Sequence, residues 1–279
     1  MRKRGIQKIL KTKPTIEGAG VHLMRGFSYN EVSDFDPFLL FDDFSGENPS
    51  DYRAGFPWHP HRGIETVTYM LKGSAEHKDS IGSSGVIGPG DVQWMTAGSG
   101  IIHQEMPIES EEGIQGFQLW VNLPAKNKMM SPRYQDISNK DIQKVEKDGT
   151  KVKVIAGVYG DIKGPVSDLM VKPIYFDVSL EKGKTFSCAL PKGYTAFLYI
   201  ISGGVLIGDH DELVESGNII LTTHEDFFEC TSTESSAHFL FISGKPLGEK
   251  IAWHGPIVMN TEVELQEAFD EYRDGTFVK

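Results

Sequence analysis

The chain has 279 residues, more than one hydrophobic core commonly serves, so one large barrel or two smaller domains are expected. Its formal net charge of −11 repels nucleic-acid phosphate and anionic lipid, which excludes direct binding to nucleic acid. Hydrophobic residues make up 39% of the chain, which excludes wholesale disorder, and the 30 Gly and 14 Pro indicate many tight turns between short strands.

Targeting and redox features point to the cytoplasm. The sequence has no run of 18 or more apolar residues and no apolar segment near its N-terminus, so neither a membrane span nor a signal peptide is expected. Its two cysteines, Cys188 and Cys230, are too few for a disulfide framework. We expect two buried thiols that pack as small hydrophobic side chains, with a soft-metal site or a disulfide as alternatives. A cytoplasmic protein is therefore expected, and we also expect it to be a monomer.

The first half of the chain is predicted to be β-structure. Short apolar runs broken by Gly, Pro and Asp predict strands at residues 66–71, 85–88 and 117–121. After Pro124 the composition shifts to Lys, Asn, Ser and Asp as far as Gly149, which indicates a domain boundary. We therefore expect an N-terminal domain over residues 1–130 and a C-terminal domain over residues 131–279.

The second half repeats the β-pattern and ends in a helix. Strands are predicted at residues 152–155, 174–178, 197–201, 218–221 and 238–242. Thr261 and Glu264 have the spacing of a capping box, and Leu265, Ala268, Phe269 and Tyr272 follow at helical spacing. Gly275 is a suitable stop, so one short amphipathic C-terminal helix is expected.

The two halves resemble each other in the order of their strands and turns. An offset of 130 residues superposes the segment around Tyr69 on that around Tyr199, and an offset of 127 superposes Gly90 on Gly217. Identity between the halves is weak, but the order of elements agrees. We therefore predict two copies of one β-domain, each of about 110–130 residues.

Two pairs of residues in the first copy have the spacing of metal ligands. His59 with His61, and His103 with Glu105, are each two positions apart, so on an extended strand both members point the same way about 6–7 Å apart. If their strands are neighbours, the four groups converge on one point. Such a set suits a first-row transition ion, namely Fe(II), Mn, Co, Ni, Cu or Zn. The alternative is that these are ordinary polar side chains.

Glu65 is a rival for the carboxylate position. It follows His61 by four residues, which on a regular strand separates the two by about 13 Å, so only a bend would bring it to the same point. Glu105 needs no such bend. We therefore expect Glu105 at the metal and Glu65 as a supporting or ion-paired residue.

The motif of His-x-His, a following Glu, a Gly-rich turn and a later His resembles that of the cupin superfamily of small β-barrels. Some details differ, because Thr96 stands where a Pro is usual and four residues rather than two separate Gly98 from His103. With those departures the chain resembles the pirin family over nearly its whole length. The motifs that carry the resemblance are residues 37–43, 59–63, 93–98, 103–106 and 253–256.

The pirin resemblance implies an all-β fold of two cupin-type antiparallel β-barrels, a bicupin, with a short C-terminal helix. It also implies one iron in the N-terminal barrel, held by His59, His61, His103 and Glu105. Trp58 stands where relatives often carry a smaller or polar residue, so it is expected either at the pocket mouth or in the core. His254 is expected to form hydrogen bonds in a loop rather than to bind metal.

The second copy lacks the metal-binding pattern. The repeat offsets place Ala189, Pro191, Cys230 and Ser232 at the positions of the four candidate ligands, and these cannot form a three-imidazole site. The C-terminal barrel is therefore expected to be a scaffold.

Two functions follow from the resemblance. One is a quercetin 2,3-dioxygenase, in which a metal, Fe(II) first of all, binds the 3-oxygen of a flavonol, O₂ reacts, and Glu105 acts as ligand and as general base. The other is an iron-containing interaction protein that acts as a transcription cofactor or redox sensor through a protein partner. A metal-dependent isomerase or hydrolase of a small anionic metabolite is a third hypothesis.

Overall fold

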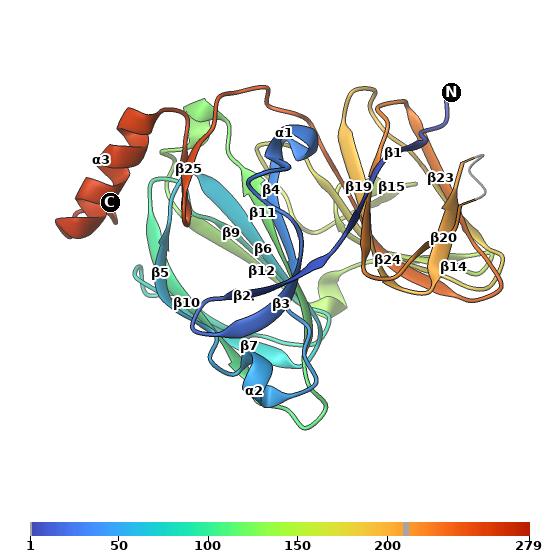
Figure 1. The fold of residues 1–279 in the computed structure, drawn as a ribbon, viewed down its shortest axis with the longest axis horizontal. Helices are drawn as coiled ribbons and strands as arrows, with labels where there is room; N and C mark the ends of the chain where they lie inside the picture. The colour runs from blue at the N-terminus through green and yellow to red at the C-terminus, as the bar shows by residue number, and fades with distance from the viewer. Residues whose placement is uncertain (1, 209–211) are drawn as a thin grey trace. The chain divides into compact units, whose positions relative to one another are not determined.

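The protein is almost entirely β-structure. The computed structural model describes residues 2–208 and 212–279, and its strands form two compact units (Figure 1). Each unit contains one seven-stranded and one four-stranded antiparallel sheet, with a short hairpin beside them. The prediction of an all-β fold with two barrels and one short C-terminal helix is confirmed.

The limits of the two units differ from the expected boundary near residue 130. The first unit, called here the N-terminal barrel, contains residues 13–32, 38–139 and 247–279. The second, the C-terminal barrel, contains the residues up to 12 together with 33–37 and 140–246. The C-terminal helix therefore groups with the N-terminal barrel, which a boundary drawn from composition along the chain does not reveal.

The N-terminal barrel has two sheets whose strands are not in chain order. In the seven-stranded sheet the order is β12 (Arg133–Ile137), β9 (Val92–Thr96), β6 (Ile64–Lys72), β11 (Gln115–Asn122), β4 (Phe38–Asp43), β3 (Val21–Phe27) and β2 (Lys13–Glu17). In the four-stranded sheet it is β5 (Phe56–His61), β10 (Ile101–Ile108), β7 (Ser74–Asp79) and β8 (Ser84–Ile87).

Short elements complete this unit. They are helix α2 (Pro49–Tyr52), the 3₁₀ turn η1 (Ala125–Asn127), the hairpin of β25 (Ala252–His254) and β26 (Ile257–Met259), and helix α3 (Glu262–Arg273). Two further short helices lie where the chain passes between the units, α1 (Val32–Phe35) and the 3₁₀ turn η2 (Asn139–Asp141).

The C-terminal barrel has the same arrangement. Its seven-stranded sheet runs β1 (Ile6–Lys11), β22 (Asn218–Thr222), β19 (Thr195–Ser202), β24 (Ala237–Gly244), β17 (Ile174–Leu180), β14 (Thr150–Ala156) and β13 (Lys144–Lys147). Its four-stranded sheet runs β18 (Thr185–Ala189), β23 (Phe227–Ser232), β20 (Gly204–Ile207) and β21 (Val214–Glu215). The hairpin of β15 (Val158–Tyr159) and β16 (Ile162–Lys163) is separate.

The strand registers define which residues of the two barrels correspond. Tyr69 pairs with Val92 in one barrel, and Tyr199 pairs with Ile219 in the other, so β6 and β19 correspond at offset 130 and β9 and β22 at offset 127. These are the offsets found in the sequence. The predicted repeat is therefore confirmed in the order and pairing of the strands.

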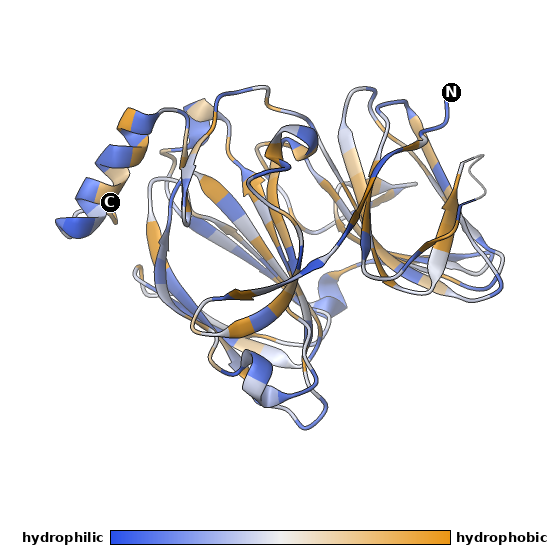
Figure 2. Ribbon diagram, in the orientation of Figure 1, coloured by the Kyte–Doolittle hydropathy of each residue, from blue (hydrophilic) through white to orange (hydrophobic). Residues whose placement is uncertain are grey.

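Apolar side chains fill the C-terminal barrel. Phe186, Phe228 and Phe241 are fully buried, with ring centroids 5.0 Å apart for Phe228 and Phe241 and 5.4 Å apart for Phe186 and Phe241. Figure 2 shows hydrophobic and hydrophilic residues mixed along the strands, as expected where side chains alternate between the two faces of a sheet. Burial of these rings supplies a large hydrophobic contribution to folding.

Helix α3 begins where the sequence predicts. The hydroxyl of Thr261 accepts a hydrogen bond from the backbone N–H of Glu264, and the Glu264 carboxylate accepts one from the backbone N–H of Thr261, which completes the capping box. Leu265 and Ala268 are buried with Ile257 and Phe277 in one apolar cluster. The apolar face of the helix thus packs on its own hairpin and tail.

No helix in the described part of the chain is long and apolar enough to cross a membrane. The cytoplasmic location and the monomeric state remain predictions.

A buried lysine joins three segments of the N-terminal barrel. Lys128 is 1% exposed, and its ammonium donates hydrogen bonds to the carbonyls of Gly63 and Val258 and to the Asn122 side-chain oxygen, at 2.7–3.0 Å. Burial lowers the pKa of Lys128 to about 7. Each of the three ammonium protons therefore has an acceptor, which offsets the cost of burying the amine.

We predict that Lys128→Met lowers the free energy of unfolding by about 3 kcal/mol, because the buried oxygens of Gly63, Asn122 and Val258 each lose a hydrogen-bond donor. Urea titration followed by circular dichroism measures this change. Lys126→Met, at an exposed position two residues away, is the control and is expected to change stability by less than about 0.5 kcal/mol. Equal losses in the two variants would contradict the structural role of Lys128.

Candidate metal centre

Two neighbouring strands of the four-stranded sheet carry the three predicted histidines. Strands β5 and β10 are antiparallel, with His59 opposite His103 and His61 opposite Ile101. The register shifts between His103 and Glu105, so Glu105 lies opposite Phe56 and β5 contains one extra residue, a β-bulge. The condition stated for the two pairs, that their strands are neighbours, is therefore met.

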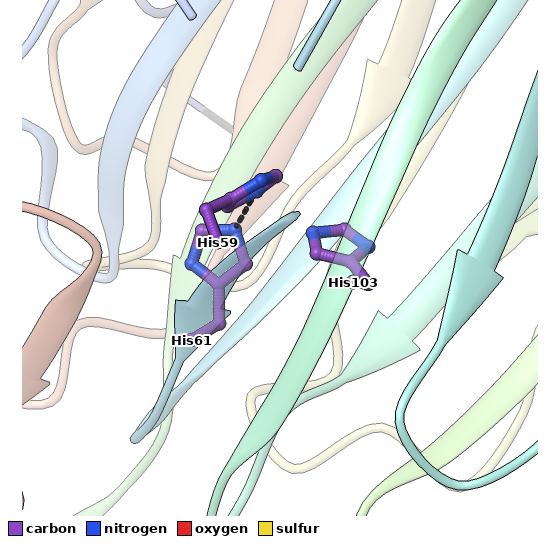
Figure 3. A group of neighbouring side chains, drawn as sticks. All are labelled: His59, His61 and His103. Atoms are coloured by element: carbon purple, nitrogen blue, oxygen red, sulfur yellow. Dashed lines mark hydrogen bonds between the residues drawn. The ribbon is translucent and has the colours of Figure 1, made fainter. Parts of the chain in front are cut away.

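The three imidazole rings face one another. One ring nitrogen from each of His59, His61 and His103 lies within 4.8 Å of the others. Figure 3 shows the three side chains beside one another. Their ring centroids are 4.4–5.1 Å apart. In residues 2–208 and 212–279 no other group of three His, Cys, Asp or Glu side chains has such a geometry.

Backbone carbonyls determine which nitrogens carry protons. Nδ1 of His59 lies 2.8 Å from the Pro57 carbonyl, and Nδ1 of His61 lies 3.0 Å from the Pro256 carbonyl. A carbonyl only accepts, so each Nδ1 must carry a proton, and each neutral ring then has a lone pair on Nε2. These two Nε2 atoms are 3.1 Å apart. Two lone pairs at this distance repel each other unless a cation or a proton lies beside them.

His103 contributes a third nitrogen that lacks a partner. Its side chain is 1% exposed, and neither ring nitrogen has a hydrogen-bond partner. Burial, followed by the neighbouring His61, His59 and His77, lowers the pKa of His103 well below its usual value. Burial and His59 lower the pKa of His61 in the same way. Because metal ligation requires neutral imidazole, the site fits a transition-metal ion.

The two candidate carboxylates lie in different surroundings. Glu105 lines the same pocket as His59 and His61, and its oxygens accept hydrogen bonds from the Thr68 hydroxyl at 2.7 Å and the Gln118 amide at 3.0 Å. It is not one of the groups within 4.8 Å of the histidine nitrogens. The role of Glu105 as a ligand therefore remains a prediction.

Glu65 is held by residues other than the histidines. It is fully buried, and it accepts hydrogen bonds from the Trp94 indole at 3.1 Å and from the Thr96 hydroxyl at 2.7 Å. Burial raises the pKa of Glu65. It does not line the pocket beside His59, in agreement with the argument that it would need a bend to reach the metal.

A pocket of about 630 Å³ opens beside the histidines, a size typical of sites for small molecules. Three aromatic rings form a row from His61 outward: Trp120 at 5.0 Å from His61, Trp253 at 6.1 Å from Trp120, and Tyr29 at 5.5 Å from Trp253, measured between ring centroids. Tyr29 is 62% exposed, so the row reaches the surface. The row gives the pocket an aromatic wall that suits an aromatic ligand.

An ion-pair network forms another part of the lining. Arg25 donates two hydrogen bonds to Asp42, at 2.8 and 2.9 Å, and one to Glu17 at 2.8 Å. All three residues line the pocket. The pocket therefore combines aromatic faces with charged and polar groups.

Two further residues lie differently from expectation. Trp58 is 51% exposed and does not line the pocket. Both expectations for it, at the pocket mouth or in the core, are therefore wrong. His254 lines the pocket and packs edge-on against Phe269, with ring centroids 5.5 Å apart. It is not part of the histidine group that can hold a metal.

Comparisons with known proteins agree with this architecture. Residues 20–121, which include all four predicted ligands, match the Pirin family, and residues 175–278 match the Pirin C-terminal cupin domain. A pirin-like protein of Caulobacter vibrioides is 44% identical over 276 residues, covering 98% of this chain and 99% of that protein. The chain belongs to the pirin family.

Two other similar proteins are informative. Human pirin is 43% identical over 262 residues, covering 92% of this chain and 88% of that protein. The crystal structure of a quercetin 2,3-dioxygenase from Acinetobacter baumannii is 34% identical and covers 99% of both chains, with a TM-score of 0.90. The predicted family and the bicupin fold are therefore confirmed.

Corresponding positions in the C-terminal barrel carry other residues. Cys230 pairs with Phe186 as His103 pairs with His59, and Phe228 pairs with Cys188 as Ile101 pairs with His61. The sequence offset of 130 placed Ala189 and Pro191 there, which is wrong because the β18–β19 connection is longer than the β5–β6 connection. Cys188 and Cys230 are free thiols, and burial raises the pKa of each.

We predict one transition-metal ion per chain, bound by the histidine group. His59→Ala combined with His61→Ala removes two of the three imidazoles, so the purified variant is expected to contain less than about a tenth of the metal of the unaltered protein. Elemental analysis measures the metal, and circular dichroism checks that the variant is folded. A folded double variant with one metal per chain would place the site elsewhere.

We predict different effects for the two glutamates. Glu105→Ala is expected to weaken metal binding at least tenfold, because the carboxylate beside the histidines is lost. Glu65→Ala leaves the Trp94 and Thr96 donors unpaired and is expected to lower the free energy of unfolding by about 2–3 kcal/mol without that loss of affinity. Metal titration and urea titration of both variants distinguish these roles, and the opposite pattern would make Glu65 the metal-site carboxylate.

Proposed function

We propose that this protein is a metal-dependent dioxygenase of the quercetin 2,3-dioxygenase type. The observation that carries the proposal is the group of three converging imidazoles beside an aromatic-walled pocket containing a carboxylate. The 34% identity to a quercetin 2,3-dioxygenase over 99% of both chains supports the same chemistry. The proposed substrates are a flavonol and O₂.

In this proposal His59, His61, His103 and Glu105 hold the metal. Fe(II) is the ion we propose first, and the same donor set accepts Ni, Cu, Mn, Co or Zn. When bound, such an ion supplies open coordination positions for a substrate oxygen and for O₂. Only one such ion is expected per chain, because the corresponding positions of the C-terminal barrel hold Phe186, Cys188, Cys230 and Ser232.

Glu105 is the proposed general base. Its carboxylate lies in the pocket wall, where it can take the proton of the flavonol 3-hydroxyl. Thr68 and Gln118 each donate a hydrogen bond to one of its two oxygens, which fixes the plane of the carboxylate. These two neighbours therefore orient the base toward the substrate.

The aromatic wall accounts for the class of substrate. A flavonol is a flat, conjugated molecule, and the aromatic rings of Trp120, Trp253 and Tyr29 line the pocket. Stacking against these rings would hold the 3-hydroxyl toward Glu105 and His61. In the overall reaction one flavonol and one O₂ give one ring-opened ester and one carbon monoxide.

We predict that iron-loaded protein consumes O₂ in a one-to-one ratio with quercetin and does not react with quercetin methylated at the 3-oxygen, because that oxygen then has no proton for Glu105 to remove. An oxygen electrode together with the loss of flavonol absorbance measures this. Glu105→Ala is expected to reduce the rate at least 100-fold even when the metal is restored.

The alternative function is that of an interaction protein, as a transcription cofactor or redox sensor. It would replace the dioxygenase if iron-loaded protein left quercetin unchanged in air, yet bound a protein partner with an affinity that changed with the oxidation state of the metal.

A further inference from the structure

The C-terminal segment, residues 252–279, lies beside the metal site. It does so although it is far in sequence from strand β5, which carries His59 and His61. The hairpin of β25 and β26, helix α3 and the tail belong to the same compact unit as the three histidines. Trp253, His254, Gly255 and Pro256 line the pocket with His59 and His61. The catalytic pocket proposed above is therefore not complete without this segment.

One atom of this segment contacts a predicted ligand directly. The carbonyl oxygen of Pro256 accepts the Nδ1 proton of His61 at 3.0 Å. This contact fixes His61 in the tautomer whose Nε2 carries a lone pair, and it also fixes the plane of the ring. A shift of the hairpin would break this hydrogen bond, so that His61 could adopt either tautomer and its ring could rotate.

Arg62, the residue after His61, anchors the tail from the other side of β5. Neighbouring side chains on a strand point to opposite faces, so Arg62 is directed away from the pocket. Its guanidinium is 2% exposed, donates a hydrogen bond to the Phe277 carbonyl at 2.9 Å and lies 2.7 Å from a carboxylate oxygen of Glu271. It also lies 4.2 Å from the centre of the Phe277 ring, a cation–π contact.

The backbone around β5 is shaped to accept the hairpin. The N–H of Val258 donates to the Arg62 carbonyl at 3.1 Å, and Lys128 joins the carbonyls of Gly63 and Val258. Gly63 has a φ of +76°, and a Cβ there would lie 2.0 Å from the Val258 carbonyl oxygen. Any side chain at Gly63 would therefore displace the hairpin.

The tail also contacts the turn that leads into β10. A Cβ on Gly100 would lie 2.6 Å from the Phe277 carbonyl oxygen and 3.0 Å from its ring. Gly100 directly precedes β10, which carries His103. Phe277, itself 1% exposed, is thus wedged between the end of one ligand-bearing strand and the start of the other.

We propose that residues 252–279 position His61 for metal binding, with Pro256 as the orienting group and Arg62 and Phe277 as the anchors that hold the segment in place. The proposal rests on the metal-binding part of the function proposed above and not on the dioxygenase reaction. Arg62 and Phe277 are positioning residues, because neither lines the pocket.

Arg62→Met and Phe277→Ala test the proposal in the full-length protein. Both variants are expected to bind Co²⁺ about 10–100-fold more weakly and to show an altered visible spectrum of the bound ion, because His61 loses its fixed orientation. Arg273→Ala is the matched control, since Arg273 belongs to the same C-terminal segment, at the end of helix α3, and its side chain is 68% exposed. It is expected to bind Co²⁺ within twofold of the unaltered protein.

A second measurement needs no metal. Nitrogen-15 NMR of the imidazole groups in metal-free protein reports the tautomer of His61, which is expected to be protonated at Nδ1 in the unaltered protein and in Arg273→Ala. In Arg62→Met and Phe277→Ala a mixture of tautomers is expected. Circular dichroism ensures that only folded variants are compared.

The two proposals fail in different ways. If the unaltered protein binds no Co²⁺, the metal-binding function fails, and the tautomer measurement still tests the positioning of His61. If folded Phe277→Ala and Arg62→Met keep the affinity, the Co²⁺ spectrum and the single His61 tautomer of the unaltered protein, the C-terminal segment only stabilises the fold and the positioning role is overturned.

Discussion

The protonation of two imidazoles, the partly buried His59 and the buried His61, is the constraint on which the site depends. Carbonyl oxygens of Pro57 and Pro256 each take an Nδ1 proton, which leaves two Nε2 lone pairs 3.1 Å apart. Such an arrangement is unfavourable by itself and becomes favourable when a cation accepts both lone pairs. The strands, the bulge in β5 and the C-terminal hairpin all contribute to holding these groups together against their mutual repulsion.

The two barrels show what this constraint costs in packing. The C-terminal barrel has the same strand order, but Phe186 takes the place of His59, and its ring packs against Phe228 and Phe241. Its interior is therefore an apolar core. The N-terminal barrel instead has His103 with unpaired ring nitrogens and a pocket of about 630 Å³. At these positions it therefore lacks the apolar burial that the C-terminal barrel has.

Much of the fold follows from local pattern. The predicted strands agree with β6, β8, β11, β14, β17, β19, β22 and β24, because alternating apolar residues and turn residues act over short distances. The capping box at Thr261 determines the start of α3 for the same reason. The sequence pattern did not reveal which other elements each helix or strand packs against. The helix packs with Ile257 and Phe277 rather than in the C-terminal barrel, and only tertiary contacts determine that.

The site shows the same division. Spacing of two residues on a strand identified His59, His61 and His103, because that geometry is local. The offset that placed Ala189 and Pro191 opposite these ligands was wrong, since a longer connection before β19 changes the register and no periodic signal marks it. Pro256 was part of a recognised motif, but its role depends on a carbonyl whose direction cannot be inferred from residue type.

Glu105 links the two sheets of the N-terminal barrel. It lies on β10 of the four-stranded sheet, and both of its hydrogen-bond donors come from the seven-stranded sheet, Thr68 on β6 and Gln118 on β11. The histidines are held by the first sheet and by the C-terminal hairpin, whereas the carboxylate is held by the second sheet. The distance between base and imidazoles is therefore set by how the two sheets pack, so the closed barrel, and not the β5–β10 pair alone, is the smallest unit that can form this site.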